Sequence, residues 1–284
     1  MDNKLGTLYI VSTPIGNLGD ITSRAIKILN KVDICAAEDT RKSAKLFNAN
    51  NIDTKLTSYH KFSEKSKTNQ LIEELLSGKD IAIISDAGTP LISDPGRYIV
   101  NKAIEEGIEI VPIPGASSVI TALSISGFNV NNFKFFGFLP RKKKEKEVLI
   151  REICSSGFTS VIFESGNRIG RLLDEISKKL PENIQILVAR EMTKIHETFY
   201  RGTVLEVKED LNSSEYGTKG EFVLVVSAFK KEIKDDFSDE DERIIDILLD
   251  SLPKKEALSL ASKILNKKRN FLYKKKLDQN NINQ

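Results

Sequence analysis

The sequence predicts an α/β protein with two α/β domains and a small C-terminal helical module. Short strands in the first part of the chain are apolar throughout and alternate with amphipathic stretches of helical period, which is typical of a parallel sheet covered on both faces. Further along, several strands lie close enough in sequence for antiparallel pairing, which indicates a mixed sheet. The C-terminal stretch carries only helical patterns.

These changes of pattern divide the chain of 284 residues into four parts. We predict an N-terminal α/β domain over residues 1–116 and a second α/β domain over residues 117–229. A charged linker over residues 230–240 leads to the helical module over residues 241–284. Hydrophobic residues make up 40% of the chain and charged residues 29%, which is typical of a globular protein with a substantial core.

Each strand of the first domain is a short apolar run that ends at a turn. The predicted strands are residues 8–12, 32–36, 81–85 and 108–113. The first helix begins near Asp20 or Thr22, because Ala25, Ile26 and Leu29 share one face. Further helices are predicted over residues 69–77, over residues 95–106, and after the turn at residues 114–118 up to the glycine at position 127. Glycines follow the ends of these helices, as is common at helix C-termini.

The second domain has a different rhythm, with strands in closer succession. Its predicted strands are residues 133–138, 160–165, 185–191, 198–202 and 221–227. Its predicted helices are residues 144–155, 168–179 and 204–211. In the C-terminal module, Pro253 suits the first turn of a helix, where its missing N–H is not needed.

Composition excludes several classes of protein. Only two cysteines, Cys35 and Cys154, and two histidines are present, which is too few at the wrong spacing for a structural zinc site, so no metal is expected. Both cysteines have apolar neighbours and are expected to be buried. The N-terminus lacks the pattern of a signal peptide, and prolines and serines interrupt the most apolar stretch, residues 110–125. We therefore expect a cytoplasmic protein with no membrane segment.

The net charge of +3 is unevenly distributed along the chain. Acidic residues outnumber basic ones over residues 230–250, whereas the C-terminal module and the run 141–144 are rich in Lys and Arg. Such runs suit a phosphate backbone, although a charge run is more often a solvated face. The lysine-rich module, including Lys274, Lys275 and Lys276, could bind RNA phosphates, pack as a helical tail or bind a protein.

Three predicted strands of the first domain end in turns of small residues. The turns begin at Thr13, Asp86 and Pro114 and contain glycine with Ser or Thr. Ligands of open parallel sheets bind outside the carboxyl ends of the strands, so these turns predict a cleft there. The chain has neither of the common phosphate-binding glycine loops, which disfavours ATP hydrolysis and a standard dinucleotide site.

At these same turns the sequence resembles a known family. The run 85–96, SDAGTPLISDPG, is similar to a signature of the tetrapyrrole methylase superfamily, and the chain resembles the branch that methylates the 2′-oxygen of a cytidine in bacterial small-subunit (16S) ribosomal RNA. Supporting segments occur in the expected order at residues 12–18, 37–41, 114–118, 136–140, 163–165 and 189–197.

The resemblance implies two α/β domains that hold S-adenosylmethionine between them, and commonly a homodimer. It also implies contacts to the cofactor. Carried over by position, the expected cofactor residues are Pro14, Asp86, Ala87, Gly88, Ser117, Phe163 and Glu164, with Arg190, Glu191 and Gly220 from the second domain. The expected partner is the RNA of the small ribosomal subunit. We expect the assembled subunit to be the substrate, because a ribose itself carries no sequence information and shape must supply the specificity.

Methyl transfer to a ribose hydroxyl benefits from a base, because the hydroxyl is a weak nucleophile. The candidate bases are Glu38, Asp39, His196 and Glu197, and Arg41 and Lys194 could bind phosphate or developing negative charge. The sequence does not choose among them: residues 38–41 could equally form a helix cap with a local ion pair, and His196 could be structural.

Two other functions remain as alternatives. One is a methyltransferase that acts on a tetrapyrrole, and the other is a non-enzymatic RNA-binding or ribosome-assembly factor. The basic runs and the residues at 37–41 argue against the first, and binding of the cofactor would argue against the second.

Overall fold

The computed structural model describes residues 4–60, 64–229, 239–265 and 267–280, with side chains up to residue 274. The chain forms two compact units, Met1–Lys230 and Lys231–Gln284. The first unit contains both predicted α/β domains, whose boundary at residues 116 and 117 stays a prediction. Residues 230–238 of the predicted linker, and the side chains of Lys275 and Lys276, lie outside the described residues.

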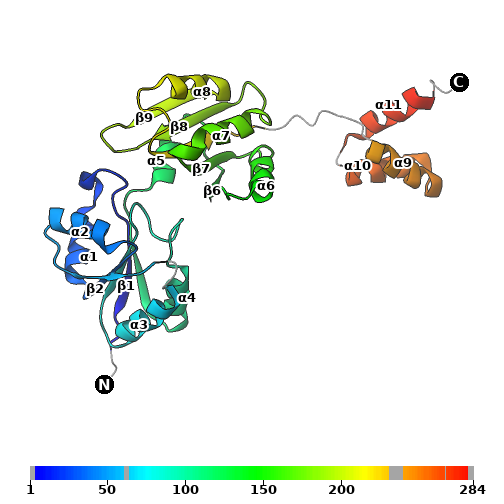
Figure 1. Ribbon diagram of the computed structural model, residues 1–284. Coiled ribbons are helices and arrows are strands. Elements are labelled where there is room, and N and C mark those ends of the chain that lie inside the picture. The colour runs from blue at the N-terminus through cyan, green and yellow to red at the C-terminus, as the bar shows by residue number, and fades with distance from the viewer. Residues whose placement is uncertain (1–3, 61–63, 230–238, 266, 281–284) are drawn as a thin grey trace. The chain divides into compact units, whose positions relative to one another are not determined.

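The first unit begins with a five-stranded sheet in the order β3-β2-β4-β1-β5, in which all pairs are parallel (Figure 1). The strands are β1 (Thr7–Val11), β2 (Ile34–Ala37), β3 (Lys55–Ser58), β4 (Ile81–Ile84) and β5 (Glu109–Ile113). Its helical elements are η1 (Leu18–Asp20), α1 (Ser23–Lys31), α2 (Thr40–Ala49), α3 (Glu64–Leu76), α4 (Arg97–Glu105) and α5 (Ser118–Ser124).

Neighbouring residues of a strand pack on opposite faces of this sheet. Leu8 belongs to an apolar cluster with residues of α3 and α4, and Tyr9 belongs to a separate cluster with residues of α1 and α2. Strands buried on both faces must be apolar at every position, which explains why the sequence shows continuous runs. The predicted parallel sheet with helices on both faces is confirmed.

The first and last turns of several helices follow the predicted chemistry. Thr22 caps α1, since its hydroxyl accepts a hydrogen bond from the Ala25 N–H at 3.1 Å. Gly78 and Gly107 follow α3 and α4 with φ of +93° and +69°, a region that glycine enters without steric cost.

Two elements of the first sheet were missing from the sequence prediction. Helix α2 buries only Ser43, Leu46 and Phe47, and its other residues are mostly polar, so its apolar pattern is sparse. Strand β3 has four residues at the edge of the sheet, none of them fully buried. An edge strand pairs on one side only and therefore needs no continuous apolar run, so its sequence signal is weak.

The second sheet of this unit has the order β6-β7-β10-β8-β9, with β6 and β7 parallel and the other pairs antiparallel. The strands are β6 (Phe133–Phe138), β7 (Thr159–Ser165), β8 (Gln185–Arg190), β9 (Thr198–Thr203) and β10 (Glu221–Val226). The helices are α6 (Lys143–Ile153), α7 (Gly166–Ser177) and α8 (Val204–Ser213). The predicted mixed sheet is confirmed.

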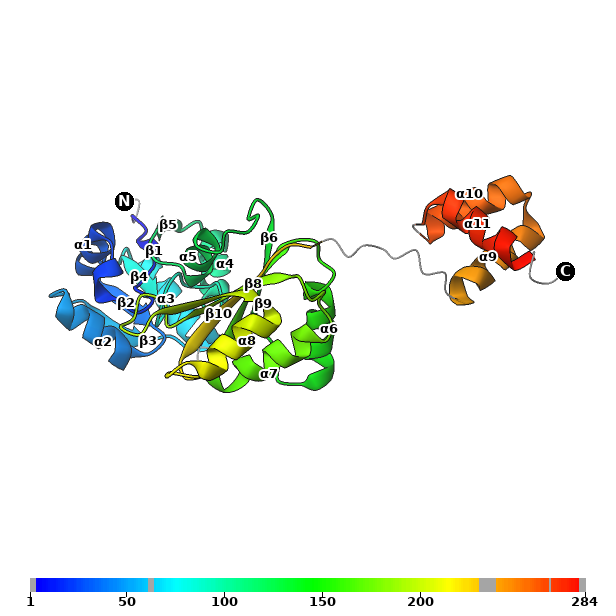
Figure 2. The same ribbon diagram turned by 90° about the horizontal axis from the view of Figure 1, so that it is seen from above.

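The two faces of the second sheet have different coverings (Figure 2). Helices α6, α7 and α8 pack on one face, where Ile150, Leu172 and Val207 join the largest apolar cluster. On the other face, α5 contributes Val119 and Leu123 to a smaller cluster with β7, β8 and β10. Helix α5 follows β5 in the chain and packs on the second sheet, so it connects the two sheets. It covers only part of this face.

The second unit contains three helices, α9 (Asp239–Ser251), α10 (Lys254–Ile264) and α11 (Arg269–Asn280). Ile245, Leu258, Ala261 and Leu272 form its core. An ion pair between Lys267 and Asp241, both nearly buried, joins the start of α9 to the segment before α11. Among the described residues of both units, no helix is long and apolar enough to cross a membrane.

Candidate functional site

The turns after β1, β4 and β5 lie side by side, because these three strands are neighbours in the sheet. Thr13 and Gly88 exchange backbone hydrogen bonds of 2.9 and 3.0 Å. The Thr89 hydroxyl donates to the Ala116 carbonyl at 3.3 Å and accepts a hydrogen bond from the Ser12 hydroxyl at 3.1 Å. The three turns therefore form one cross-linked platform at the carboxyl edge of the sheet.

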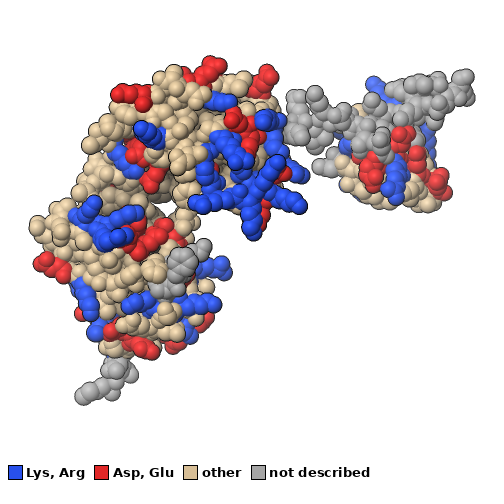
Figure 3. All heavy atoms as spheres, viewed as in Figure 1, with Lys and Arg blue, Asp and Glu red and all other residues tan. Residues whose placement is uncertain are grey.

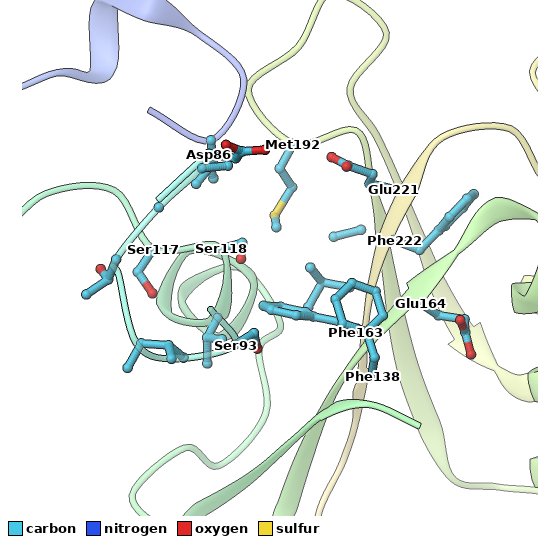
Figure 4. A pocket seen from close by; sticks show the side chains of 18 of the residues that line it. Asp86, Ser93, Ser117, Ser118, Phe138, Phe163, Glu164, Met192, Glu221 and Phe222 are labelled. Atoms are coloured by element: carbon cyan, nitrogen blue, oxygen red, sulfur yellow. The ribbon is translucent and has the colours of Figure 1, made fainter. Parts of the chain in front are cut away.

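A pocket of about 230 Å³ lies between this platform and the open face of the second sheet (Figure 4). The platform contributes Ile15, the turn residues 86–89 and the start of α5, including Ser117 and Ser118. The second sheet contributes Phe138, Phe163, Ala189, Phe222 and Val223. Figure 4 shows Ser117 and Ser118 on one side, Phe138 and Phe163 on the other, and the Met192 side chain pointing into the space between.

Phe163 is held by other aromatic rings. Its ring meets that of Phe135 edge-on, with centroids 4.8 Å apart, and that of Phe138 at 5.5 Å. Edge-to-face pairs of this kind are favourable beyond the area that they bury. The apolar wall of the pocket is therefore fixed before any ligand arrives.

Gly88 is required by its backbone conformation and by its position in the pocket. It has φ of +81°, and a Cβ atom at this position would lie 3.3 Å from the Ile15 side chain. Glycine thus lets the chain turn and keeps the pocket open.

Three carboxyl groups gather at the platform. Asp86 and Asp94 line the pocket, and Glu38 lies at the end of β2, next to β4, without lining it. Burial raises the pKa of Glu38, and the nearby charges of Asp94 and Asp86 raise it further. The pKa of Asp94 is raised by burial too, with a smaller contribution from Asp86. Asp86 accepts hydrogen bonds from the Lys42 ammonium at 2.6 Å and from the Asp39 N–H at 3.0 Å.

Asp39 and Arg41 are engaged with each other at the start of α2. The Asp39 carboxylate accepts hydrogen bonds from the Arg41 N–H at 2.9 Å and from its guanidinium at 2.8 and 3.1 Å. These bonds hold the pKa of Asp39 well below its usual range. Residues 39–41 thus have the geometry of a helix cap with a local ion pair, and a carboxylate with a lowered pKa is a poor proton acceptor.

The wall formed by the second sheet ends in the loop between β8 and β9, which ion pairs hold in place. Lys194 donates to Glu191 at 2.9 Å and to Glu221 at 2.8 Å. Although partial burial opposes it, the hydrogen bond from Lys194 lowers the pKa of Glu191. Glu191 and Thr193 have φ of +50° and +66°, a conformation that costs non-glycine residues energy and is common at functional sites.

His196 and Glu197 belong to this loop and not to the pocket wall. The His196 ring stacks on the Tyr216 ring at 4.6 Å, and the Glu197 carboxylate accepts a hydrogen bond from the Thr193 N–H at 2.6 Å. His196 lines a second, more open depression with residues 16–18 of the turn after β1, and this depression shares Glu191 and Lys194 with the pocket.

The structure brings most of the predicted cofactor residues to one pocket. Those that line it are Asp86, Ala87, Gly88, Ser117, Phe163, Glu164 and Glu191. Their contacts to a cofactor stay predictions. The carboxylate of Glu164 is turned towards α7, where it pairs with Arg168 at 3.1 Å.

Pro14, Arg190 and Gly220 are next to lining residues but do not line the pocket themselves. The Arg190 guanidinium donates to the carbonyls of Lys219 at 2.7 Å and His196 at 2.8 Å, so it holds two loops in place instead of facing the pocket. Gly220 lies against Glu191, since an added Cβ would be 2.7 Å from its side chain.

Sequence reasoning missed several lining residues. Phe138, Ser93 and Asp94 lie within segments that carried the family resemblance, so the signal was present but these positions were not singled out. Met192 also lies within such a segment, at residues 189–197. Phe222 and Val223 belong to an apolar run that predicts an ordinary strand, and only the position of the second sheet places them at the pocket.

The comparisons with known proteins agree with this geometry. The sequence model of the family described as "Tetrapyrrole (Corrin/Porphyrin) Methylases" matches residues 7–208. The protein of Vibrio cholerae called "Ribosomal RNA small subunit methyltransferase I" is 42% identical over 272 residues, which cover 96% of this chain and 94% of that protein. The protein of the same name from Halalkalibacterium halodurans is 46% identical over 225 residues, 79% of this chain and 76% of that protein.

Solved structures share the fold at low sequence identity. A uroporphyrin-III-C-methyltransferase from Thermus thermophilus superposes with a TM-score of 0.53 at 19% identity. The cobalt precorrin-4 methyltransferase superposes with a TM-score of 0.55 at 17% identity. Each covers 78% of this chain and 94% of its own.

Proposed function

Because the chain belongs to the tetrapyrrole methylase family, in the branch of the ribosomal RNA small subunit methyltransferase I proteins, we propose that it methylates the 2′-oxygen of a cytidine in small-subunit ribosomal RNA. The protein is a methyltransferase, and S-adenosylmethionine is the cofactor of its family. The observation that carries the proposal is the identity of about 40% to these relatives over nearly the whole chain, 96% of it in one case.

The pocket has the chemistry that S-adenosylmethionine requires. Phe163, Ile15 and Val223 offer an apolar surface for the adenine, and the hydroxyls of Ser117 and Ser118 offer partners for the polar groups of the amino-acid part. When bound, this cofactor supplies a methyl group on a sulfonium, which is open to attack by an oxygen nucleophile.

The chain's own residues would position the reactants and accept a proton. The 2′-oxygen forms a bond to the methyl carbon while the carbon–sulfur bond breaks, so the hydroxyl proton must leave to a base. We propose Glu38 for this role, since it is half-buried beside Asp86 and burial raises its pKa, which makes the carboxylate a better proton acceptor. Much of the acceleration comes from holding the oxygen and the methyl group in line.

The roles of the other predicted catalytic residues are secondary in this proposal. Asp39 and Arg41 would fix the start of α2, and His196 and Glu197 would shape the loop that borders both depressions. The same family resemblance supports a homodimer, and an rRNA substrate supports a cytoplasmic location. Light scattering of the purified protein tests the first of these two expectations.

The test is transfer of labelled methyl from S-adenosylmethionine to small ribosomal subunits that lack the modification, with naked rRNA alongside. We expect label at one cytidine, with the phosphodiester bond on its 3′ side resistant to alkali. No label on either RNA substrate, despite measurable binding of the cofactor, would overturn the proposal. A uroporphyrinogen sample in the same assay tests the alternative of a tetrapyrrole substrate.

A further inference from the structure

A dense group of cations covers the start of α6 (Figure 3). Arg141, Lys142, Lys143 and Lys144 are all exposed, and we call these four residues the α6 basic surface. Lys142 pairs with Glu145 at 3.1 Å. Arg141, Lys143 and Lys144 form no ion pair with any residue that the structure describes. At least three positive charges are thus available to an anionic partner.

Local stability does not explain this arrangement. The N-terminal end of a helix carries a partial positive charge, so cations there are unfavourable by about 0.3–1 kcal/mol each. Lys142 is the N-cap of α6, with no capping hydrogen bond from its side chain, and Lys143 and Lys144 occupy the first turn. An anion at this surface would remove the repulsion that the isolated protein contains.

The α6 basic surface is connected to the cofactor pocket by a short, fixed segment. Phe138 lines the pocket at the end of β6, and only Leu139 and Pro140 separate it from Arg141. Three residues of extended chain span at most about 11 Å. Leu139 is buried, and its carbonyl accepts a hydrogen bond of 2.6 Å from Arg168.

Arg168 ties the same segment to the pocket from the other side. Its Nε pairs with Glu164, a lining residue whose side chain is 1% exposed, at 3.1 Å. Helix α6 is in turn fixed to α7 by the ion pair of Lys146 with Glu175 at 2.7 Å. Lys143 and Lys144 are therefore on a helix that is fixed to α7, and Arg141 and Lys142 lie in the short bend directly before it.

From this placement we propose that the α6 basic surface binds the phosphate backbone of the small-subunit RNA within a few nucleotides of the methylated residue. The inference rests on the proposed function, and it adds the surface that holds the substrate. Backbone contacts of this kind fix the register of an RNA on a protein without reading its sequence. The target ribose would thereby be brought to the pocket.

The test uses the full chain and small ribosomal subunits that lack the modification. The variant combines Arg141→Gln, Lys143→Gln and Lys144→Gln, which remove three charges and keep good helix formers. Binding is measured across a salt series. If all three cations contact phosphates, the ratio of wild-type to variant affinity falls about 20- to 40-fold between about 50 and 200 mM salt, and the salt slope falls by about 2 to 3.

Matched controls separate charge at this surface from charge in general. The combination Lys4→Gln, Lys27→Gln and Lys55→Gln removes the same charge from exposed positions of the first unit and should leave the slope close to that of the wild type. A second control combines Arg141→Lys, Lys143→Arg and Lys144→Arg. It keeps all three charges and should also keep the salt slope of the wild type. Calorimetric affinity for S-adenosylmethionine should be unaltered in all variants, which verifies that the pocket is intact.

The outcomes separate this inference from the proposed function. If the wild type methylates the subunits but the Gln variant binds them with an unchanged slope, the α6 basic surface does not hold the RNA and the proposed function stands. If the two triple-Gln variants lose the slope equally, the effect is net charge and the assignment of the surface is wrong. A wild type that neither binds nor methylates the subunits would overturn both.

Discussion

Carboxyl groups at the two walls of the pocket have pKa values shifted in opposite directions. The wall from the parallel sheet carries Asp86 and Asp94 with Glu38 behind them, and burial together with mutual repulsion raises the pKa values of Glu38 and Asp94. The wall from the mixed sheet carries Glu191, whose pKa is lowered by its bond from Lys194. Like-charged carboxyls favour a proton, whereas an ion pair excludes one. The first wall is therefore suited to proton transfer and the second to a fixed shape.

The largest effect that would test this contrast is the loss of the carboxyl at Glu38. Glu38→Gln should lower the turnover number about 10²- to 10⁴-fold if Glu38 is the general base, as measured by methyl transfer at saturating cofactor. Asp39→Asn is the matched control from the neighbouring position and should cost stability at the α2 cap instead. Near-normal turnover of the Glu38 variant would show that Glu38 does not accept the proton.

A substitution at Gly16, in the turn after β1, tests the contact between the platform and the β8–β9 loop. An added Cβ at this position would lie 2.6 Å from the Lys194 side chain and 2.9 Å from the Met192 carbonyl, so Gly16→Ala should force the β8–β9 loop away. We expect about 1–3 kcal/mol of lost stability in thermal unfolding, with weaker cofactor binding. Gly170→Ala, in α7 with no atom within 4 Å of the added Cβ, is the control and should stabilise the protein.

The apolar part of the second wall is tested at Phe163. Phe163→Leu removes the edge contacts to Phe135 and Phe138, and we expect cofactor affinity to fall about tenfold, or roughly 1.4 kcal/mol. Phe158→Leu changes a ring that does not line the pocket and serves as the control in the same calorimetric titration. If both variants lose the same cofactor affinity, the effect comes from general packing of the protein and not from the aromatic side chains at the pocket.

The smallest effect is the pH dependence of stability. A carboxyl whose folded pKa is raised, as at Glu38, contributes stability that is fully present below its unfolded pKa of about 4.3 and is lost as pH rises through the folded value. Glu38→Gln should therefore match the wild type in acid and be more stable at neutral pH, by about 0.5 kcal/mol or less because the group is partly exposed.

Glu191 should behave in the opposite way. Its lowered pKa contributes stability above about pH 4.3, and that stability is lost as pH falls through the folded value. Glu191→Gln should thus be less stable than the wild type at neutral pH and approach it in acid. Denaturant titrations at several pH values measure both variants, and differences of the same sign would contradict the contrast between the walls.

The sequence predicted the architecture well where burial is complete and less well at the edges. Leu8 and Ile81 belong to continuous apolar runs that only a two-sided parallel sheet requires, so β1 and β4 were evident. The edge strand β3 and helix α2 were missed, because no residue of β3 is fully buried and only Leu46 and Phe47 are large apolar residues on the buried face of α2.

The sequence by itself determined the fold class, the family and the turns that form the platform, because glycine, proline and hydroxyl residues at strand ends reflect local backbone requirements. Only the tertiary structure decided which side chains face the pocket. Arg190 lies in a segment that resembles a cofactor contact, yet its guanidinium binds two loop carbonyls, and Met192 points into the space. The direction of a side chain and the pKa of a carboxyl depend on partners distant in sequence, such as Asp94 beside Glu38, and those two residues meet only because β2 and β4 are neighbours in the folded sheet.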